Sequence, residues 1–374
     1  MTTSNKKKIC YIISGVDYSL GFLWLSQNID KEKYEVSFIF LSKSKPSLFE
    51  EFANEKFTYS WIKCNSKLDY ISIFFRLAIY FIRYRPSIVH AHLIEAGLIS
   101  IPASFFVGVK KRIYTRHHAT YNIYYYPHMV KYDKLINYFS THIIAISNNV
   151  AQVLIQTEKT DPSKVHVIPH GFELSLFETP IAQNIEKLRL KYNPQEQKPV
   201  IGVISRFIEL KGLQYILPAF KKLLVSQPNA LLIMANATGN YKKEIDKLLQ
   251  SIPKKNYITI EFEKDLFSLY KLFDLFIHVP INDSVEAFGQ VYVEALAAGI
   301  PSVFTLSGIA RDFIQHEKNA LIVNYKSSDE IFQSICTLIN NTALRNQLIE
   351  DGRNHVNKMF SFDKSLVEMY KIYD

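Results

Sequence analysis

The chain has 374 residues, of which 48% are hydrophobic and 21% charged, and its formal net charge is +9. At about 100–200 residues per domain, a globular chain of this length is expected to form two domains. The three cysteines form no CxxC pair, which excludes a disulfide framework and a zinc set and favours a reducing compartment. No apolar run reaches the roughly 18 residues that a membrane-spanning helix needs.

The positive charge is concentrated in the first half. Residues 1–180 hold 21 basic and 14 acidic side chains, a net charge of +7, whereas residues 181–374 hold 23 and 21, a net charge of +2. Either the first half faces an anionic partner, or lysine usage simply drifts along the chain. The basic and then apolar start resembles a signal peptide, but Ser14 and Asp17 end the apolar run early, so we predict a first strand there.

Short apolar runs, each followed by a helix-like segment, recur through the first half. They are KICYIIS, YEVSFIFL, PSIVHAH, RIYTRHH, HIIAIS and VHVIPHG. These runs are β-branched and do not alternate, which is typical of strands buried on both faces of a parallel sheet. His90 and His92 lie in the third run; we expect only one of them to point to a given face, and both to be structural.

The segment DYISIFFRLAIYFIRYRP predicts a helix that ends before Pro86. Ser72, Arg76 and Arg83 fall within one narrow stripe at about 100° per residue, and the rest of the helix is almost wholly apolar. We expect a buried crossover helix with one solvent-exposed edge. The alternative is an interfacial helix that holds the protein on anionic lipid.

The same strand pattern returns in the second half, after a polar stretch at residues 172–199. The runs are PVIGVIS, ALLIMAN, YITIEF, DLFIHVP, PSVFTL and ALIVNY. Strands and helices that alternate in this way predict an α/β fold of doubly wound domains. Because the set occurs twice, we predict two Rossmann-like domains.

The stretch SVEAFGQVYVEALAAGIPSV, residues 284–303, connects two of the predicted strands. A helix is expected to start near Gly289 and to end at Gly299. Glu286 precedes this helix and Glu294 lies inside it, so at ~1.5 Å rise per residue the carboxylates are about 10 Å apart. At this distance the two carboxylates cannot share a proton. They could instead bind the two hydroxyl-bearing ends of one elongated ligand that has a diphosphate between those ends. The N–H groups at the helix start can bind anions.

The segment EAFGQVYVEALAAGIPSV resembles the E-x7-E motif of glycosyltransferase family 4, the retaining nucleotide-sugar enzymes of GT-B fold. Three further segments, GVISRFIELKGLQYILPAF, KVHVIPHGFELSLF and FSFDKSLVEMYKIYD, also resemble that family. The resemblance implies two Rossmann-like domains that face across a cleft. The acceptor-binding domain would be residues 1–180 and the nucleotide-sugar-binding domain residues 181–355, with a C-terminal helix at 356–374 that packs back on the first domain.

The resemblance also implies roles for residues of the second half. Glu294 would hold the ribose hydroxyls and Glu286 a hydroxyl of the donor sugar. The amides of Phe288 and Gly289 would help to orient that sugar. Two cations, Arg206 and Lys211, would reach the diphosphate and neutralise the charge that builds on the leaving group. Further phosphate contacts would come from Ser307 and Gly308.

In the first half, Gly15 would lie at the donor phosphates, although the family often has paired glycines where this chain reads SGVDYSLG. One of the adjacent His117 and His118, with His118 favoured, would contact the donor sugar near the reacting centre. Tyrosines stack on sugar faces, so the loop with Tyr121, Tyr124, Tyr125 and Tyr126 is the acceptor-site candidate, together with His117. The alternative is a tyrosine-rich packing loop.

The implied reaction is hexosyl transfer from a UDP- or GDP-linked sugar to a hydroxyl of a glycan or lipid-linked acceptor. The resemblance implies retained configuration, with the leaving diphosphate helping to deprotonate the acceptor and with no cofactor or metal. A role in bacterial surface polysaccharide, lipopolysaccharide or glycolipid synthesis is expected. The expected location is cytoplasmic, with an anionic membrane surface as a further partner at the inner face of the cytoplasmic membrane.

Two other classes of protein remain open from the residues alone. A glycoside hydrolase also uses paired carboxylates, at roughly 5–9.5 Å across the scissile bond. A non-enzymatic nucleotide- or lipid-binding protein would share the basic first half. Nucleic acid is not an expected partner, because no basic aromatic recognition motif is present.

Overall fold

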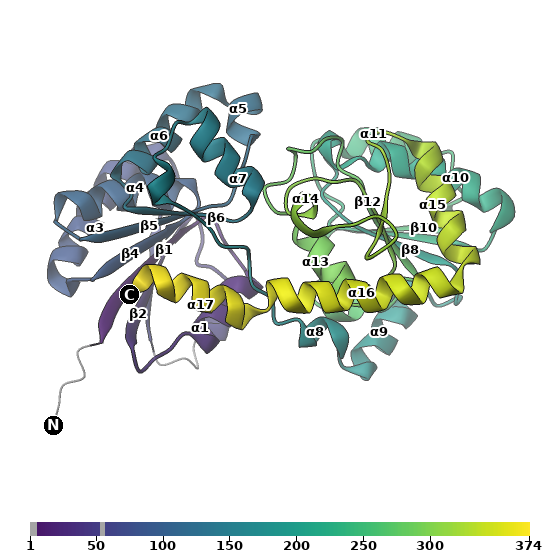
Figure 1. Cartoon of the computed structure of the whole chain (residues 1–374), viewed down its shortest axis with the longest axis horizontal. Helices are drawn as coiled ribbons and strands as arrows, with labels where there is room; N and C mark the ends of the chain where they lie inside the picture. The colour runs from purple at the N-terminus through teal and green to yellow at the C-terminus, as the bar shows by residue number, and fades with distance from the viewer. Residues whose placement is uncertain (1–5, 53–56) are drawn as a thin grey trace. The chain divides into compact units, whose positions relative to one another are not determined.

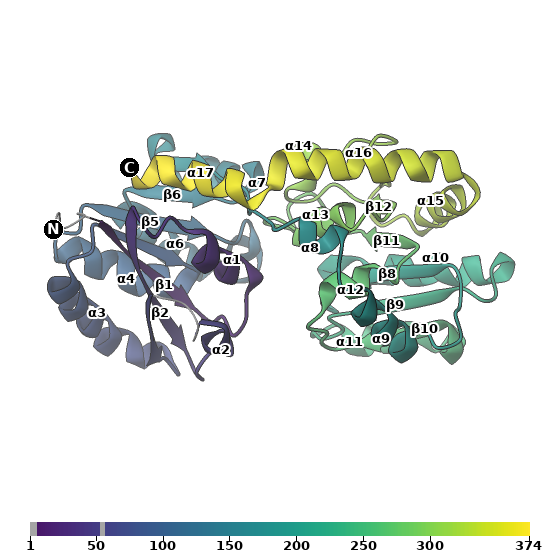
Figure 2. The same cartoon turned by 90° about the horizontal axis from the view of Figure 1, so that it is seen from below.

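In the computed structural model, residues 6–52 and 57–374 are described. Contacts divide the chain into two compact units: unit 1 is Met1–Phe172 with Phe362–Asp374, and unit 2 is Glu173–Ser361. Figures 1 and 2 show the chain from two directions. The change of unit after Phe172 comes before the predicted boundary after residue 180, because α8 (Ser175–Glu178) packs on α12 (Leu266–Tyr270) and α13 (Gln290–Ala297) of unit 2.

Unit 1 is built on a seven-stranded parallel sheet with the order β3-β2-β1-β4-β5-β6-β7. Its strands are β1 (Lys7–Ser14), β2 (Tyr34–Ser42), β3 (Thr58–Lys63), β4 (Ile88–His92), β5 (Lys111–Arg116), β6 (His142–Ala145) and β7 (Val165–Val167). The six predicted runs form six of these strands. The strand β3 was not predicted, because it is an edge strand with mostly exposed or half-buried side chains and therefore no continuous apolar run.

Helices cover both faces of the unit 1 sheet. They are α1 (Leu20–Asn28), α2 (Leu48–Phe52), α3 (Tyr70–Tyr84), α4 (Ile94–Phe106), α5 (Tyr121–Tyr125), α6 (Val130–Phe139), α7 (Asn148–Gln152) and α17 (Phe362–Tyr373). One face carries α3, α4 and α6, and the other carries α1 and α17 (Figure 1). Right-handed crossovers account for this arrangement, since the chain moves outward from β1 in one direction and then returns past it to β4.

The helix α3 differs from the expectation of a buried crossover helix with one solvent-exposed edge. It buries only Ile73, Leu77 and Phe81 against the unit. Ile71 and Phe75 are exposed, at 72% and 60% of their surface. That expectation is wrong, because the apolar residues extend around more of the helix than its contacts with α4 can cover.

Unit 2 is built on a six-stranded parallel sheet with the order β10-β9-β8-β11-β12-β13. Its strands are β8 (Val200–Ile204), β9 (Leu231–Ala235), β10 (Tyr257–Ile260), β11 (Leu275–His278), β12 (Ser302–Phe304) and β13 (Leu321–Ile322). The remaining helices are α9 (Ala182–Tyr192), α10 (Leu213–Ser226), α11 (Lys242–Leu249), α14 (Ala310–Phe313), α15 (Ser328–Asn340) and α16 (Thr342–Phe360). One buried core joins the strands to α10, α11 and α15.

The C-terminal segment returns to unit 1. The chain breaks its helical conformation at Ser361, whose ψ of 144° is extended, and α17 begins at Phe362. Tyr373 of α17 is buried, and its hydroxyl lies 2.7 Å from that of Tyr11 in β1. The segment that packs on unit 1 therefore starts six residues later than the predicted residue 356.

None of the helices within residues 6–52 and 57–374 has the length and apolar character that crossing a bilayer requires.

Candidate active site

The order of the unit 2 sheet reverses between β8 and β11, because the chain runs from β8 outward to β10 and then returns to the other side of β8. Ligands of doubly wound sheets bind beside the carboxyl ends of the strands at such a reversal. Arg206 and Lys211 follow β8, and Glu286 follows β11. The topology therefore brings the loops that carry these predicted site residues to one edge of unit 2.

Lys211, Glu286 and His278 form a polar cluster at this edge, in which Glu286 and His278 are buried and Lys211 is half-buried. Lys211 Nζ forms an ion pair with Glu286 Oε1, and His278 Nε2 lies 2.9 Å from the same carboxylate oxygen. Since a carboxylate only accepts, the histidine donates from Nε2. Glu286 is 7% exposed. Burial opposes its ionisation, but Lys211 and His278 outweigh burial and hold the pKa of Glu286 well below its usual range.

Lys211 ends a short 3-10 helix, Glu209–Lys211, and Gly212 connects it to α10. Gly212 adopts a φ of +78°, and a Cβ atom there would lie 1.9 Å from the carbonyl oxygen of Val279. Only glycine lets the loop after β8 approach the backbone after β11 so closely. This close approach sets the position of Lys211 relative to Glu286.

The loop after β12 supports the loop that carries Glu286. Ser307 Oγ accepts a hydrogen bond of 3.0 Å from the Glu286 N–H, and the Ile309 N–H donates to the Phe288 carbonyl at 2.9 Å. A Cβ atom on Gly308 would lie 2.7 Å from that same carbonyl oxygen. Ser307 and Phe288 are both buried. In this structure, Ser307 and Gly308 therefore hold the backbone from Glu286 to Phe288 in place.

Glu294 lies on α13 and is buried rather than solvated, with 7% of its surface exposed. The hydroxyl of Tyr270 donates to its Oε2 at 2.8 Å. Burial raises the pKa of Glu294 to about 7, which the hydrogen bond from Tyr270 counteracts only in part. The helix begins after Gly289, whose φ is +86°. Glu286 and Glu294 therefore differ sharply: the first is held as a carboxylate and the second is easily protonated.

Arg206 directly follows Ser205 after β8, and its side chain is exposed. Within the described part of the chain, its guanidinium forms no hydrogen bond or ion pair. It thus remains available to an anion, whereas Lys211 is already paired with Glu286.

In unit 1, His118 belongs to a buried network at the end of β5. Its Nε2 lies 3.1 Å from Asp133 Oδ1, and the Asn122 amide donates to the other oxygen of Asp133 at 2.8 Å. Arg116 is 1% exposed and pairs with both Asp133, at 3.0 Å, and Glu158. Burial and the Arg116 charge lower the pKa of His118. Burial and Arg116 therefore favour the neutral ring of His118, whereas Asp133 opposes this shift and fixes the position of the ring.

His117 points into a different set of side chains. Its Nε2 lies 3.1 Å from His92 Nδ1, and its ring stacks on His170 with centroids 5.4 Å apart. Burial is the main cause that lowers the pKa of His117, and the neighbouring histidines lower this pKa further. The rings of His90 and His92 lie 4.3 Å apart, so the expectation of opposite faces is wrong: residues two apart in a strand share a face.

Gly15 follows β1 with a φ of +63°, and its N–H donates to the Leu41 carbonyl at 2.9 Å. That N–H extends the sheet rather than pointing to a ligand. The glycine borders a pocket of about 230 Å³ at the carboxyl ends of β1, β2 and β3, which is lined in part by Ser14, Lys67 and Glu95. Ser14 Oγ donates to Glu95 Oε2 at 3.1 Å.

The tyrosine loop forms α5, and its side chains are exposed: Tyr121 at 48% and Tyr124 at 67%. Tyr121 lies against Tyr125, with ring centroids 5.4 Å apart. Asn122 of the same helix reaches the His118 network. The loop is therefore tied to His118 by Asn122, and its tyrosines face outward.

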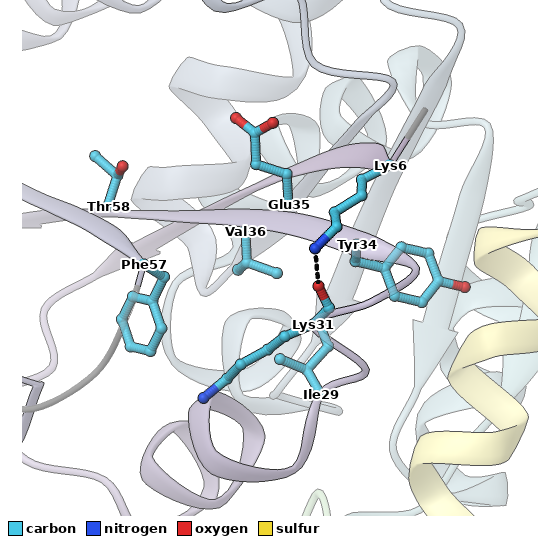
Figure 3. Close-up of a pocket in the computed structure, with 8 residues that line it drawn as sticks. All are labelled: Lys6, Ile29, Lys31, Tyr34, Glu35, Val36, Phe57 and Thr58. Atoms are coloured by element: carbon cyan, nitrogen blue, oxygen red, sulfur yellow. Dashed lines mark hydrogen bonds between the residues drawn. The ribbon is translucent and has the colours of Figure 1, made fainter. Parts of the chain in front are cut away.

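A larger cavity of about 450 Å³ lies at the opposite end of the unit 1 sheet, where β2 begins (Figure 3). Lys6 Nζ donates to the Lys31 carbonyl at 2.7 Å across this cavity. None of the predicted site residues lines it.

Three buried partners of the site residues were not predicted from the sequence: His278, Tyr270 and Asp133. A signal existed for His278, because it is a polar residue at the end of the apolar strand DLFIHVP. Tyr270 and Asp133 lie on helices 24 and 15 residues away from Glu294 and His118, and no local pattern connects them.

Comparison with known proteins gives matches to two family models. Residues 23–176 match "Glycosyltransferase Family 4", and residues 184–355 match "Glycosyl transferases group 1". The second match contains Arg206, Lys211, Glu286 and Glu294.

Among known proteins, the chain is similar to the capsular polysaccharide biosynthesis glycosyltransferase CapM of Staphylococcus aureus. The two are 27% identical over 312 residues, which span 80% of this chain and 79% of CapM. A GDP-mannose-dependent phosphatidylinositol monomannoside mannosyltransferase of Corynebacterium glutamicum is 23% identical over 52% of both chains.

Among solved structures, HepE of Anabaena in complex with UDP-glucose matches with a TM-score of 0.83 and 18% identity, over 98% of this chain and 99% of HepE. A glycosyltransferase of Rickettsia africae matches with a TM-score of 0.81 and 21% identity, over 99% of this chain and 98% of the other. These likenesses show the GT-B fold. Together with the two family models, they show that this chain belongs to the family 4 glycosyltransferases.

Proposed function

We propose that this glycosyltransferase moves a hexose from a nucleoside-diphosphate sugar, UDP- or GDP-linked, to an acceptor hydroxyl with retained anomeric configuration. The observation that carries the proposal is the Lys211–Glu286–His278 cluster at the sheet reversal of unit 2, with the exposed cation Arg206 in the adjoining loop. UDP-glucose in the HepE structure and the GDP-mannose dependence of the C. glutamicum relative support a nucleotide-sugar donor.

The donor would bind by both of its ends. Glu286, held ionised, accepts from a hydroxyl of the sugar, with the amides of Phe288 and Gly289 orienting the ring. Glu294 accepts from the ribose hydroxyls. Arg206 and Lys211 bind the diphosphate between them. For Gly15 of unit 1, whose N–H donates to the Leu41 carbonyl, the family resemblance alone assigns a contact with the phosphates. Ser307 and Gly308 keep the Glu286 loop in position for this contact.

The transfer itself is a substitution at the anomeric carbon. The bond from that carbon to the phosphate oxygen breaks, and a bond to the acceptor oxygen forms on the same face. The acceptor proton passes to the leaving diphosphate, so no separate base is needed. Arg206 and Lys211 stabilise the charge on the leaving group in place of a metal ion. His118, fixed by Asp133, contacts the donor sugar near the reacting carbon.

The acceptor would be a surface polysaccharide or a glycolipid bound by unit 1. CapM is named for capsular polysaccharide biosynthesis, and the C. glutamicum relative for a phosphatidylinositol mannoside. Outward-facing Tyr121 and Tyr124, with His117 nearby in sequence, form one candidate surface. The pocket beside Ser14 and Glu95 is a second.

The decisive experiment replaces Lys211 by Met and Glu286 by Gln and measures sugar transfer from a panel of nucleotide sugars. We expect transfer to fall by roughly 10²- to 10³-fold in each variant, because each removes a charged group at the reacting end of the donor. Lys222→Met is the matched control, since Lys222 is an exposed lysine of unit 2 paired with Asp329. Near-normal turnover in both site variants would rule the assignment out.

The same panel separates the other two classes of protein. Release of free sugar from a simple glycoside, with no need for a nucleotide, would favour a hydrolase. A rise in melting temperature with a nucleotide sugar, but no transfer to any acceptor, would favour a nucleotide-binding protein.

A further inference from the structure

One side of unit 1 exposes an unusual amount of apolar surface. On α3, Ile71, Phe75 and Ile82 are 72%, 60% and 60% exposed and lie four and seven residues apart, on one face of the helix. The neighbouring helices add Phe106 of α4, 68% exposed, and Tyr138 of α6, 73% exposed. We call these five residues the α3–α6 face.

The face is continuous across the three helices. Phe74 of α3 and Phe106 of α4 have ring centroids 6.2 Å apart, and Phe106 is 6.0 Å from Phe139 of α6. The three helices lie side by side on the same side of the sheet (Figures 1 and 2). Of the fifteen exposed large hydrophobic side chains described in unit 1, thirteen lie between Leu68 and Tyr138.

The positive charge of the first half comes from the same segment. Residues 67–140 contain ten basic and three acidic side chains, a net charge of +7, which equals the net charge of all residues from 1 to 180. Seven of the ten basic side chains are exposed, whereas none of the acidic ones is. Asp69 caps a short helix, Glu95 accepts from Ser14, and Asp133 is buried with Arg116.

The basic residues border the apolar stripe rather than interrupt it. Arg76 and Arg83 are seven residues apart, on the edge of α3 next to Phe75 and Ile82. At a lipid surface, such arginines lay their aliphatic stems along the apolar layer and keep their charged ends at the phosphates. Exposed tyrosines such as Tyr138 favour the same boundary between apolar and polar layers. An acidic protein partner would match the charge, but it would cover the apolar stripe of α3 only if it supplied a complementary apolar groove.

We propose that the α3–α6 face docks unit 1 on an anionic phospholipid bilayer, with Ile71, Phe75, Ile82 and Phe106 inserted at the interface and Arg76 and Arg83 on the lipid phosphates. The protein lies on the membrane and does not cross it. The pocket beside Ser14 sits at the edge of this contact, because Lys67 lines it and the next residue, Leu68, is 89% exposed. The proposal does not depend on the transfer reaction.

The test is co-sedimentation of the full chain with vesicles, with neither donor nor acceptor present. Vesicles of phosphatidylglycerol with phosphatidylethanolamine should bind the chain, and vesicles of phosphatidylcholine should not. Replacement of Arg76 and Arg83 by Gln should weaken binding by roughly 25-fold, since each cation near an anionic surface contributes about fivefold. Phe75→Glu should weaken it by at least about tenfold.

Matched variants of unit 2 serve as controls. Phe262 is an exposed phenylalanine, at 76%, and Lys243 and Lys255 are exposed lysines. Phe262→Glu and the Lys243→Gln/Lys255→Gln pair should leave vesicle binding unchanged.

Two results would overturn the proposal. The first is a lack of specificity. It would appear either as equal binding of the chain to both kinds of vesicle, or as binding that the unit 2 variants weaken as much as the α3 variants do. The second is a concentration-dependent dimer in sedimentation velocity that Phe75→Glu abolishes, in a chain that binds no vesicles; the face would then be an interface between two copies. Loss of vesicle binding in Phe75→Glu counts only if its melting temperature equals that of the parent chain.

Discussion

The carboxylate of Glu294 is the site residue whose protonation is most open to measurement. Burial raises its pKa from 4.5 to about 7, so the folded chain binds a proton there that the unfolded chain has released. The stabilisation is therefore complete below about pH 4.5 and is lost as the pH rises through about 7. A shift of this size corresponds to about 3 kcal/mol in the free energy of unfolding of unit 2.

We expect Glu294→Gln to remove this pH dependence, because the amide cannot ionise. Urea unfolding of both chains between about pH 5 and about pH 8 gives the comparison. The parent chain should lose stability relative to the variant as the pH rises. Parallel curves over the whole range would mean that Glu294 titrates at its ordinary pKa.

Arg116 is the residue on which the His118 network depends. It is 1% exposed and is the ion-pair partner of both Asp133 and Glu158. Replacing it by Met leaves two buried carboxylates without a counter-charge, and we expect a loss of about 3–5 kcal/mol in the free energy of unfolding of unit 1.

The control for Arg116→Met is Arg189→Met. Arg189 also pairs with two carboxylates, those of Glu186 and Glu196, but it does so at the surface of unit 2. Exposed pairs contribute little, so the unfolding midpoint should barely move. Equal effects of the two replacements would show that burial does not decide the strength of the Arg116 network.

At the scale of elements, the sequence predicted most strands, because a strand buried on both faces appears in the sequence as a continuous apolar run. Runs such as KICYIIS and DLFIHVP are continuously apolar, and they became β1 and β11. The edge strand β3 was missed, because its exposed side chains interrupt the apolar run. The exposed face of α3 was misjudged for a related reason: an apolar side chain in the sequence does not reveal whether another element covers it.

The candidate site shows the same limit. The loops that carry Lys211 and Glu286 follow predicted strands, so their approach follows from the fold class. The partners Tyr270 and Asp133 lie on separate helices, 24 and 15 residues from Glu294 and His118, and they are fixed by packing that no periodicity encodes. The predicted roles of the site residues stay predictions until the variants are measured.

The loop between β8 and α10 provides a test of how an element positions Lys211, for which we propose a role in binding the donor diphosphate. Gly212 and Gly108 have nearly equal φ values, +78° and +79°, but a Cβ on Gly212 would meet the Val279 carbonyl at 1.9 Å, whereas one on Gly108 would meet nothing within 4 Å. Alanine at either position costs roughly 1–2 kcal/mol for the left-handed backbone.

Only Gly212→Ala also pushes the Lys211 loop away from the backbone after β11. We therefore expect Gly212→Ala to weaken donor binding, measured by the thermal shift with a nucleotide sugar, and Gly108→Ala to leave it unchanged. A full donor shift in Gly212→Ala would show that Lys211 can adapt without this close approach.

At the scale of the whole molecule, the notable feature is that unit 1 is completed by the last residues of the chain. Tyr373 is 1% exposed, and its hydroxyl lies 2.7 Å from that of Tyr11 and 2.8 Å from His90 Nδ1. Lys111 Nζ donates to the Ile372 carbonyl at 2.7 Å. Strands β1, β4 and β5 therefore depend on a helix that follows unit 2 in the sequence.

Because of this connection, damage to α17 should be felt by unit 1 and not by unit 2. Tyr373→Phe removes the hydroxyl that Tyr11 and His90 share, and we expect it to lower the free energy of unfolding of unit 1 by about 1–3 kcal/mol. Val367→Ala, at a 53% exposed position of the same helix, is the control and should change little.

Hydrogen exchange followed by mass spectrometry resolves the two units: amides of β1 and β4 should exchange faster in Tyr373→Phe, while those of β8 and β11 keep their rates. Faster exchange in both units alike would mean that the contacts of α17 support the entire chain. Unchanged exchange in both units would show that the Tyr373 hydroxyl does not contribute to the stability of unit 1.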